Sequence, residues 1–481
     1  MMKRLNRILI VGAGEAGLAL LEDMRKRELA GSVLAFVDDS EQKIGATAAG
    51  IPVRGPSASI GRICNELKVT DVIIAVPSAK PQFINRLIRE ITGAGDYINI
   101  YFVPSAEKFF DSVPIFPSVR EFSYSDVLER NEFTIDLEIM ERYFSGKTVL
   151  VTGAGGSIGS EICRQLLKFR VKKIVAVGRG ENSIYHLMKS MDEYTALMEK
   201  VPLLVYRIID VKDYRLMDRL FSGEKPDIVF HAAAHKHVPL MEFNPCEALQ
   251  NNVLGTDNLL KLSAAHGVSG FVLVSTDKAV RPSSVMGATK RVCELITGYY
   301  ARTAGLCAAI VRFGNVLGSR GSVIPLFMEQ IEKGGPVTVT HPEVTRYFMS
   351  IPEASLLVIN SAAISRGGEI FVLNMGEPCR ISDVAKRLIE LHGKRPDIDI
   401  RIEYTGLRPG EKMYEELFYS EDSMIKTGND SILLMPGDGH HLRADQYARL
   451  IHSIRESLPA MDDSEVREFI KGFVPEYSPS S

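Results

Sequence analysis

The stretch KTVLVTGAGGSIGSEICRQLL, residues 147–167, decides the fold. It begins with a short apolar run, continues through a glycine-rich turn and ends in a pattern typical of a helix. This order of strand, turn and helix opens a nucleotide-binding α/β domain. Gly153, Gly156 and Gly159 permit a tight turn and let phosphate groups approach the N-terminus of the helix.

A second stretch with the same order of features, RILIVGAGEAGLALLEDM, covers residues 7–24. Gly12, Gly14 and Gly17 fit the pattern GxGxxG, and Asp38 ends the next predicted strand, where an acid can bind ribose hydroxyls. The two stretches are about one domain length apart, so they predict two Rossmann-like domains in tandem. The first either binds a second nucleotide or keeps its turn for packing alone, and its role would be regulatory or structural.

The rest of the chain predicts an α/β protein with two tandem, doubly wound domains. Buried parallel strands are expected at VLAFVDD and DVIIAVPS in the first half, and at KKIVAVG, LLVYRIID, PDIVFHAAA and GFVLVSTD in the second. We place the first domain at residues 1–117, a linker at 118–146 and the second domain at 147–481. After about residue 318 Pro and Gly rise, which predicts a C-terminal substrate-binding subdomain.

Composition excludes several classes of protein. The formal net charge is −3, which gives no general attraction to nucleic acid or to an acidic membrane. The six Cys are scattered without disulfide-framework or zinc-ligand spacing, so we expect reduced thiols and no metal site. No apolar run is long enough to span a membrane, and the N-terminus lacks the pattern of a signal peptide. A cytoplasmic protein is therefore expected.

The glycine-rich turn at TGAGGSIG has the spacing TGxxGxxG of short-chain dehydrogenases, with Thr152 placed to brace the turn. Asp210 ends the third predicted strand, where an acid can accept a hydrogen bond from adenine. Either Asn251 or Asn252 suits a helix-distorting Asn near the site. Together these features predict a bound nicotinamide dinucleotide. The residues expected to bind it are Gly153, Gly156, Ser157, Ile158, Gly159, Arg179, Asp210, Val211, Ala232, Ala233 and Lys290.

The form of the dinucleotide depends on the end of the second predicted strand. Gly178 stands where an acid would hold the adenosine ribose, and Arg179 follows it. An Arg there can accommodate the 2′-phosphate of NADP. It can also stack on adenine or lie in solvent. We expect NAD and leave NADP open.

The stretch STDKAVRPSSVMGATK, residues 275–290, holds the expected catalytic groups. Thr276, Asp277 and Lys278 follow a predicted strand, at the end where doubly wound sheets bind ligands. A carboxylic acid beside an amine can serve as acid and base. The alternative is a surface ion pair, which would contribute little.

A short-chain dehydrogenase has a Tyr four residues before its catalytic Lys. Here Met286 stands four residues before Lys290. A thioether cannot take a proton from an alcohol, so another residue must do so if the site is active.

Five pieces of sequence, TDKAV, MGATKR, RFGNVLGSRGSVIPLF, TRYFM and RPGEK, resemble the nucleotide-sugar 4,6-dehydratases of bacterial polysaccharide biosynthesis. The closest resemblance is to the large branch that acts on UDP-N-acetylglucosamine, and it covers essentially the whole chain. It implies that the second domain is an extended short-chain dehydrogenase. Members of this branch commonly carry N-terminal membrane helices. This sequence lacks them, so we expect a cytoplasmic location, at the inner face of the membrane if a longer parent carries such helices.

The resemblance implies a reaction without net redox change. C4 of the sugar is oxidised, water is eliminated across C5 and C6, and hydride returns to C6 to give a UDP-4-keto-6-deoxy sugar. Lys278 would be the base at C5, and Asp277 would protonate the leaving hydroxyl. Thr276 would bind near the C4 oxygen, and Lys290 the nicotinamide ribose. Relatives in this branch also have Met at the position of Met286.

The acceptor of the C4 hydroxyl proton is not fixed by the resemblance. We expect it to be Asp277 itself or a water held by Thr276.

The substrate side is expected to hold the UDP moiety and the sugar. Asn315 would meet the phosphates, Arg346 and Arg408 are candidate phosphate or ribose contacts, and Glu411 would take a ribose hydroxyl. Each could instead be a structural or surface charge. Lys236 and His237 follow the fourth predicted strand and border the sugar.

Two other functions stay open on the sequence alone. A UDP-sugar 4-epimerase would share the fold but would need no acid–base pair for C5 and C6. A non-catalytic protein could bind the nucleotide sugar without turnover. The adjacent Asp277 and Lys278 favour the dehydratase. A homo-oligomer is expected in each case.

Overall fold

A computed structural model describes residues 7–26, 30–76, 79, 81–92, 98–103, 120–121, 136–196, 198, 200–419, 424–435 and 442–479. The chain divides into two compact units. The larger unit contains residues 132–325, 339–381 and 404–481, and the smaller one contains residues 1–131, 326–338 and 382–403.

The larger unit is built on a nine-stranded sheet with the order β10-β9-β8-β11-β12-β13-β18-β22-β21. The strands from β10 to β18 run parallel, and β22 and β21 add antiparallel pairings. The strand order reverses between β8 and β11, which is where doubly wound sheets bind dinucleotides. The strands are β8 (Thr148–Thr152), β9 (Lys173–Gly178), β10 (Leu203–Ile208), β11 (Ile228–His231), β12 (Gly270–Val274), β13 (Ala308–Arg312), β18 (Ile370–Leu373), β21 (Ile425–Lys426) and β22 (Ile432–Met435).

One strand departs from the sequence prediction. The stretch LLVYRIID was expected to be a buried strand, but β10 forms the edge of the sheet. The side chains of Leu203 and Ile208 are 59% and 56% exposed. An apolar, β-branched run has the same sequence pattern at an edge as in the middle of a sheet, so the pattern alone could not reveal the position.

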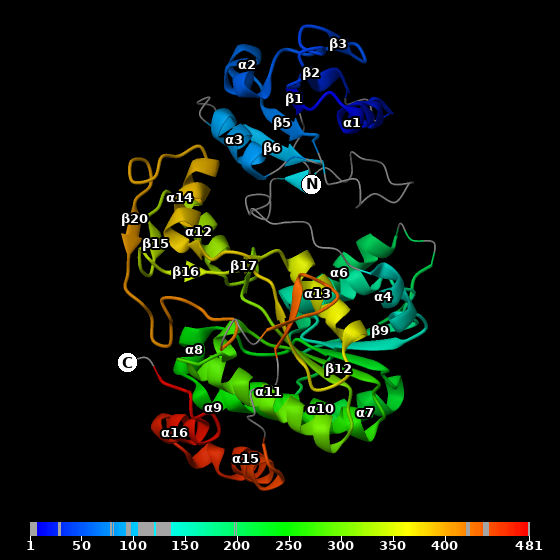
Figure 1. Ribbon diagram of the computed structural model, residues 1–481, viewed down its shortest axis with the longest axis vertical. Helices are drawn as coiled ribbons and strands as arrows, with labels where there is room; N and C mark the ends of the chain where they lie inside the picture. The colour runs from blue at the N-terminus through cyan, green and yellow to red at the C-terminus, as the bar shows by residue number, and fades with distance from the viewer. Residues whose placement is uncertain are drawn as a thin grey trace. The chain divides into compact units, whose positions relative to one another are not determined.

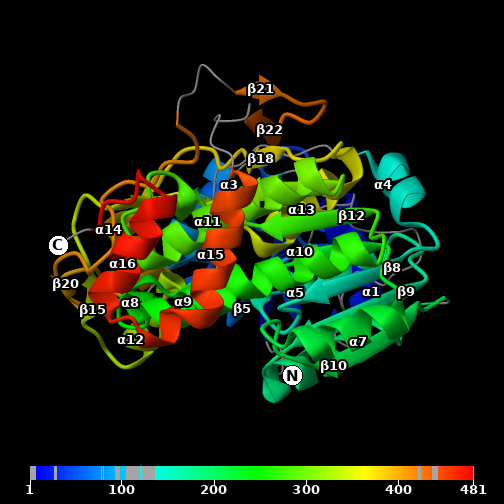
Figure 2. The ribbon, with the colours of Figure 1, turned by 90° about the horizontal axis from the view of Figure 1, so that it is seen from below.

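Helices cover both faces of this sheet. Figure 1 shows α4, α6 and α13 on one side of β9 and β12, and α7, α10 and α11 on the other. Figure 2 shows α15 and α16 lying over α9, α10 and α11. The helices are α4 (Leu137–Phe144), α5 (Ser157–Leu166), α6 (Glu181–Thr195), α7 (Tyr214–Glu224), α8 (Val238–Glu242), α9 (Pro245–Ala248), α10 (Gly255–Ala265), α11 (Val285–Thr303), α13 (Ile351–Ile364), α15 (Ala444–Glu456) and α16 (Asp463–Phe473).

The expected linker contains regular structure at both ends. Residues 120–121 form β7 (Arg120–Glu121), and helix α4 packs on α13. The side chains of Met140 and Phe144 are fully buried in the core of the larger unit. Residues 118–119 and 122–135 of the expected linker lie outside the described residues, and the domain boundaries stay predictions.

The chain after residue 318, where a substrate-binding subdomain was expected, is divided between the two units. It adds β18, β21 and β22 to the main sheet, and the helices α13, α15 and α16. Its other elements are α12 (Val323–Glu332), α14 (Ile381–Leu391) and the short strands β15 (Val337–Val339), β16 (Thr345–Arg346), β17 (Phe348–Met349), β19 (Cys379–Arg380) and β20 (Ile402–Tyr404). Strand β14 (Asn315–Val316) precedes this region and pairs with β17.

The smaller unit contains a five-stranded sheet with the order β2-β1-β5-β6-β7. Asp38, which was expected to hold a ribose, accepts a hydrogen bond from the backbone N of Ala13 at 2.8 Å and lies 3.1 Å from Lys43 Nζ. Its carboxylate therefore braces the glycine-rich turn. The elements are β1 (Ile8–Val11), β2 (Val33–Val37), β3 (Thr47–Ala48), β4 (Ile51–Pro52), β5 (Asp71–Ile74) and β6 (Asn99–Phe102), with α1 (Glu15–Lys26), α2 (Ile60–Leu67) and α3 (Pro81–Thr92).

Within the described ranges, no helix combines the length and the hydrophobicity that a membrane crossing requires. All six Cys lie in the described ranges, and the structure places none of them in a disulfide.

Candidate active site

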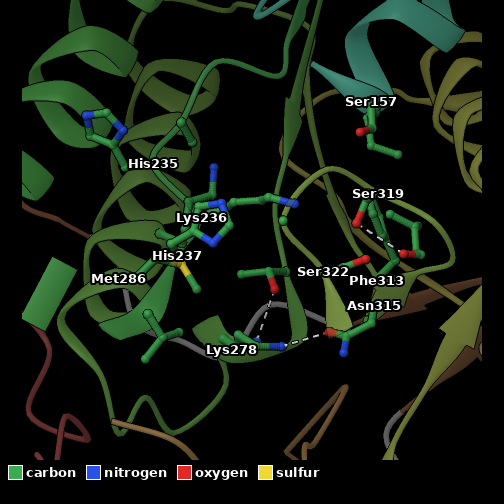
Figure 3. A pocket seen from close by; sticks show the side chains of 18 of the residues that line it. Ser157, His235, Lys236, His237, Lys278, Met286, Phe313, Asn315, Ser319 and Ser322 are labelled. Carbon is green, nitrogen blue, oxygen red and sulfur yellow. Dashed lines mark hydrogen bonds between the residues drawn. The ribbon is translucent and has the colours of Figure 1, made fainter. Parts of the chain in front are cut away.

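A cavity of about 580 Å³ opens at the carboxyl ends of β11, β12 and β13. Its wall combines the glycine-rich turn before α5, the loop after β11, the segment around Lys278, and loops near Asn315 and Glu411. Figure 3 shows Lys278 reaching toward Asn315 in this wall. The predicted cofactor turn and the predicted catalytic segment therefore share one cavity.

The turn between β8 and α5 depends on its glycines. Gly153 has a φ of +66°, and a Cβ there would lie 2.6 Å from the backbone of Ala232. A Cβ at Gly159 would lie 2.3 Å from the carbonyl oxygen of Gly153. Gly156 is the N-cap of α5 and lines both this cavity and a neighbouring one of about 210 Å³. Free amides at a helix N-terminus beside such a cradle fit a dinucleotide pyrophosphate.

Asn251 and Asn252 both lie in a distorted stretch of the helix that follows α9. Residues 249–254 form a π-helical segment, η6 (Leu249–Leu254). The side chain of Asn252 accepts a hydrogen bond from the backbone N of His235 at 2.7 Å and donates one to Thr289 Oγ1 at 3.1 Å. Of the two Asn residues that the sequence left open, Asn252 thus holds the loop after β11 against α11.

The smaller cavity lies beside the end of β9 and is lined by Gly178, Arg179, Asp210 and Val211. The guanidinium of Arg179 is 3.6 Å from Oε1 of Glu247 and is 54% exposed. A carboxylate beside Arg179 offsets the positive charge that a 2′-phosphate would need.

His231 ties two central strands together beneath the site. Its Nδ1 is 2.8 Å from Thr152 Oγ1 on β8, and its Nε2 is 3.0 Å from Thr256 Oγ1 on α10. Burial, helped by repulsion from Lys290, lowers the pKa of His231 to about 3. The ring is therefore neutral, and Thr152 braces the sheet through it.

Thr276, Asp277 and Lys278 form a compact hydrogen-bonded group. Oδ1 of Asp277 accepts a hydrogen bond from Thr276 Oγ1 at 2.8 Å and lies 3.0 Å from Lys278 Nζ. Thr276 and Lys278 line the cavity, whereas Asp277 does not and is only 1% exposed. Oδ2 of Asp277 is buried and has no hydrogen-bond partner in the described part of the chain. Asp277 therefore lies behind Thr276 and Lys278, rather than at the cavity surface as its place in the sequence suggested.

Lys278 is an ammonium ion in this arrangement. Burial alone would lower its pKa, but attraction to Asp277 and to Glu415, whose Oε1 is 3.4 Å from Nζ, outweighs burial and raises the pKa. Nζ also donates a hydrogen bond to Oδ1 of Asn315 at 3.2 Å. Asn315 was expected at the substrate phosphates, and the structure places its side chain against Lys278.

Met286 and Lys290 share one face of the first turns of α11, because they are four residues apart. Both line the cavity and are 3% and 5% exposed. Nζ of Lys290 donates a hydrogen bond to the carbonyl of Val274 at 2.7 Å. Burial lowers the pKa of Lys290.

Arg346 was expected to contact a phosphate, but its guanidinium is hydrogen-bonded to other groups of the protein. Its two terminal nitrogens donate hydrogen bonds to the carbonyls of Thr345, Met413 and Lys412 and to Oε1 of Glu411. Through these hydrogen bonds Arg346 holds the loop that contains RPGEK, residues 408–412, against β16. Arg408 lines the cavity with an exposed side chain, as a phosphate ligand would.

Lys236 and His237, which were predicted to border the sugar, both line the cavity. Burial and the neighbouring Lys278 lower the pKa of Lys236. The ring of His237 packs on Gly321, where a Cβ would lie 2.5 Å from Cε1.

Two side chains of the site were missed in the sequence. Nη1 of Arg320 donates a hydrogen bond to the carbonyl of Gly155 at 2.8 Å, so Arg320 joins the cofactor turn to the loop after β14. Glu415 lines the cavity beside Lys278 and is only 7% exposed. Arg320 belongs to the stretch RFGNVLGSRGSVIPLF that carries the resemblance, whereas Glu415 lies three residues beyond RPGEK and outside the quoted stretches.

Comparison with protein families gives two matches. The family described as polysaccharide biosynthesis protein matches residues 149–436, and a CoA-binding domain family matches residues 1–104.

Curated relatives agree with the first of these. The chain is 46% identical over 413 residues to the probable polysaccharide biosynthesis protein EpsC of Bacillus subtilis (strain 168), covering 86% of this chain and 68% of that protein. It is 45% identical to the capsular polysaccharide biosynthesis protein CapD of Staphylococcus aureus, covering 85% and 68%. It is 36% identical to a UDP-glucose 4-epimerase of Rickettsia canadensis, covering 66% of this chain and 91% of that one.

Solved structures share the fold of the larger unit. Pen from Bacillus thuringiensis has a TM-score of 0.55 at 30% identity, covering 66% of this chain and 99% of its own. The dTDP-glucose 4,6-dehydratase DesIV from Streptomyces venezuelae, solved with NAD, has a TM-score of 0.50 at 23% identity, covering 66% and 99%. The larger unit therefore has the Rossmann fold that extended short-chain dehydrogenases use as nucleotide-sugar dehydratases and epimerases.

Proposed function

Because the chain belongs to the polysaccharide biosynthesis protein family, we propose that it is a nucleotide-sugar 4,6-dehydratase whose substrate is UDP-N-acetylglucosamine. The product would be the UDP-4-keto-6-deoxy sugar, formed with loss of one water. The observation that carries this proposal is the pair Asp277 and Lys278, 3.0 Å apart at the end of β12, beside a Met in the Tyr position. An acid–base pair at this place serves an elimination, which a simple alcohol oxidation does not require.

The cofactor that fits the site is NAD, which the related fold of DesIV binds. The glycines of the β8–α5 turn and the N-terminus of α5 would hold its pyrophosphate, and Lys290 its nicotinamide ribose. Arg179 pairs with Glu247, which also holds Lys212, so Arg179 is already engaged by the protein, and we assign NAD by likeness to DesIV. When bound, NAD supplies the oxidation at C4 and the return of the electron pair at C6.

The residues around the sugar provide the proton transfers. Thr276 faces the cavity and donates its hydrogen bond to Asp277, so a proton from the C4 hydroxyl can pass through Thr276 to that buried carboxylate. Asp277 is thus the acceptor of this proton, and Thr276 is the group that contacts the sugar. Lys278 also faces the cavity and is the base for C5. Met286 has no part in proton transfer and fills the wall.

The remaining polar groups of the wall would bind the substrate. Arg408 is exposed in the cavity and suits a phosphate, since a guanidinium can donate two hydrogen bonds at once. Lys236 and His237 would border the sugar. Arg346 and Glu411 would act by holding the loop that carries Arg408.

A second candidate is a UDP-sugar 4-epimerase. The similarity to the Rickettsia canadensis epimerase, which this chain covers almost completely, supports it. Against it stands the acid–base pair Asp277 and Lys278, which an epimerase would not use.

The test is incubation of the purified protein with UDP-N-acetylglucosamine and NAD, followed by proton NMR of the nucleotide sugar. A dehydratase gives a new C6 methyl signal and loses the C4 proton. An inverted C4 configuration with an intact C6 would instead establish the epimerase. An unchanged spectrum beside tight binding of the sugar would favour the non-catalytic alternative.

The glycine-rich turn between β8 and α5, here called the glycine cradle, contains Gly153, Gly156 and Gly159 and allows a separate prediction. Gly153→Ala should weaken NAD binding by tenfold or more, about 1.4 kcal/mol, because its Cβ would meet the backbone of Ala232 and Ala does not favour a φ of +66°. Calorimetric titration with NAD measures this. Gly223→Ala, in α7 with open space around it, is the matched control and should bind NAD normally. Equal affinities for the two variants would contradict the assignment of the cradle.

A further inference from the structure

The acid–base pair Asp277 and Lys278 lies on a single turn of 3₁₀ helix, η7 (Asp277–Ala279), between β12 and α11. Two backbone hydrogen bonds close this turn, from Ala279 N to the carbonyl of Thr276 at 3.2 Å and from Val280 N to the carbonyl of Asp277 at 3.0 Å. A 3₁₀ turn has poorer hydrogen-bond geometry than an α-helix and is used only in short pieces. The position of the pair therefore depends on contacts from other parts of the chain.

The backbone that leaves this turn has an unfavourable conformation. Arg281 has a φ of +38°, in the left-handed region that residues with a side chain rarely adopt. Its Nη2 donates a hydrogen bond to the carbonyl of Tyr419 at 3.0 Å, its guanidinium lies 5.3 Å from the centre of the Tyr419 ring, and its Nη1 pairs with Glu416. Such a conformation persists where surrounding contacts fix it. Here these contacts come from the residues that follow RPGEK.

Lys412 ends the motif RPGEK and has no role in the function proposed so far. Its Nζ donates a hydrogen bond to the carbonyl of Val280 at 2.9 Å and lies 3.8 Å from Oε2 of Glu416. The side chain is 16% exposed and takes no part in the cavity wall. Lys412 therefore contacts the residue that closes the 3₁₀ turn without reaching the place of the sugar.

The loop that carries Lys412 is itself held at two further points. Nη2 of Arg346, on β16, donates a hydrogen bond to the carbonyl of Lys412 at 2.8 Å. Oγ of Ser283 donates one to the carbonyl of Gly410 at 3.0 Å. A Cβ at Gly410 would lie 2.9 Å from Cβ of Ser284, so the loop packs directly on the segment before α11. The loop is therefore a firm support for the segment that follows the catalytic turn.

We propose that Lys412 is a positioning residue for the dehydration, which holds the turn of Asp277 and Lys278 in place through the carbonyl of Val280. The inference rests on the proposed function and leaves the acid–base pair as it is. Lys412 acts through the turn and not on the sugar, because it lies outside the cavity wall. Its loss would let both catalytic groups shift, and a misplacement of about 1 Å can cost about 10²-fold in rate.

The decisive variant is Lys412→Met, which removes the donor, studied in the full-length protein loaded with NAD. The rate of water loss from UDP-N-acetylglucosamine in a single turnover should fall about 10- to 100-fold. The dissociation constant of the nucleotide sugar, measured by calorimetry, should change by less than about threefold, because no cavity residue is altered. Lys412→Arg should recover the rate to within about threefold of wild type, since a guanidinium can donate to the same carbonyl.

Lys173→Met is the matched control. The side chain of Lys173 is 17% exposed, and its Nζ lies 3.1 Å from Oε2 of Glu224. It stands at the start of β9, whereas ligands bind at the carboxyl ends of the strands. Removing this half-buried lysine should leave water loss within about twofold of wild type.

Two results would overturn the assignment. One is water loss at the wild-type rate in folded Lys412→Met. The other is a slow variant that loses affinity for the nucleotide sugar by the same factor and is not rescued by Arg. If Lys412→Met does not fold, Lys412→Gln takes its place, because its shorter, uncharged side chain also removes the contact with Val280.

Hydrogen exchange separates a failure of this inference from a failure of the proposed function. The amides of Ala279 and Val280 are bonded within the turn, so they should exchange about tenfold faster in Lys412→Met and at the wild-type rate in Lys173→Met. If the wild type releases no water, the proposed function falls and the role of Lys412 in catalysis falls with it, whatever the exchange shows. If the wild type is active and Lys412→Met changes neither exchange nor water loss, only the inference falls.

Discussion

Asp277→Asn is expected to slow oxidation at C4 by about 10²- to 10⁴-fold, because Thr276 loses the carboxylate that accepts its proton. An amide keeps the shape of the side chain and can still accept a hydrogen bond, but it cannot take a proton. The measurement is the appearance of reduced nicotinamide in a single turnover with UDP-N-acetylglucosamine. An Asn variant that reduces the cofactor at the wild-type rate would show that Asp277 does not receive the C4 proton.

Lys278→Met separates the two halves of the reaction. The variant keeps Thr276 and Asp277, so C4 should still be oxidised. It has no base for C5, so exchange of the C5 proton with deuterated water should fall about 10²- to 10⁴-fold. C5 exchange at the wild-type rate in this variant would exclude Lys278 as the base.

Glu294→Gln should lower the free energy of unfolding by about 3–5 kcal/mol, the typical cost of removing one partner from a buried ion pair. Glu294 is buried on α11, and its carboxylate accepts hydrogen bonds from Arg312 at 2.6 and 2.7 Å and from Arg291 at 3.1 Å. The substitution would leave the fully buried Arg312 without a countercharge. Ser275, which also donates to Glu294, precedes the catalytic group, so activity should fall as well.

The same carboxylate predicts a pH dependence. Burial would raise the pKa of Glu294, but Arg312 and Arg291 outweigh burial and lower it to about 2. Since the folded pKa lies below the unfolded value of about 4.3, the stabilisation is complete above that value and is lost as pH falls toward 2. The stability difference between wild type and Glu294→Gln should therefore shrink in acid.

Urea unfolding at neutral pH and at successively lower pH measures both effects. Asp218→Asn, which removes the partner of His266 in an exposed pair, is the control and should cost less than about 1 kcal/mol. A Glu294→Gln variant as stable as this control would contradict the account of the buried cluster.

The strand and turn pattern predicted most of the fold. The glycines of residues 147–167 form the expected cradle, and the strands of the second half take the expected parallel order, because glycine spacing and apolar runs are local signals. The predicted burial of β10 was wrong, because β10 lies at the edge of the sheet. The position of a strand within a sheet depends on the whole topology and not on the strand's own sequence.

The candidate site was predicted less completely. Thr276, Lys278, Met286 and Lys290 all line the cavity, as the end of a parallel strand and a helical spacing of four require. Two facts depend on side-chain burial, which no sequence pattern encodes. Asp277 is only 1% exposed and does not line the cavity, and of the adjacent glutamates after RPGEK, Glu415 is buried and Glu416 is partly exposed.

The central claim is that a site with Met in place of Tyr still eliminates water from a nucleotide sugar. Mass spectrometry of UDP-N-acetylglucosamine after incubation with the purified, NAD-loaded protein in deuterated water tests it directly. The account predicts a product lighter by one water, with UDP intact and one deuterium at C5. A nucleotide sugar of unchanged mass, recovered from protein shown to bind both NAD and the sugar, would contradict it.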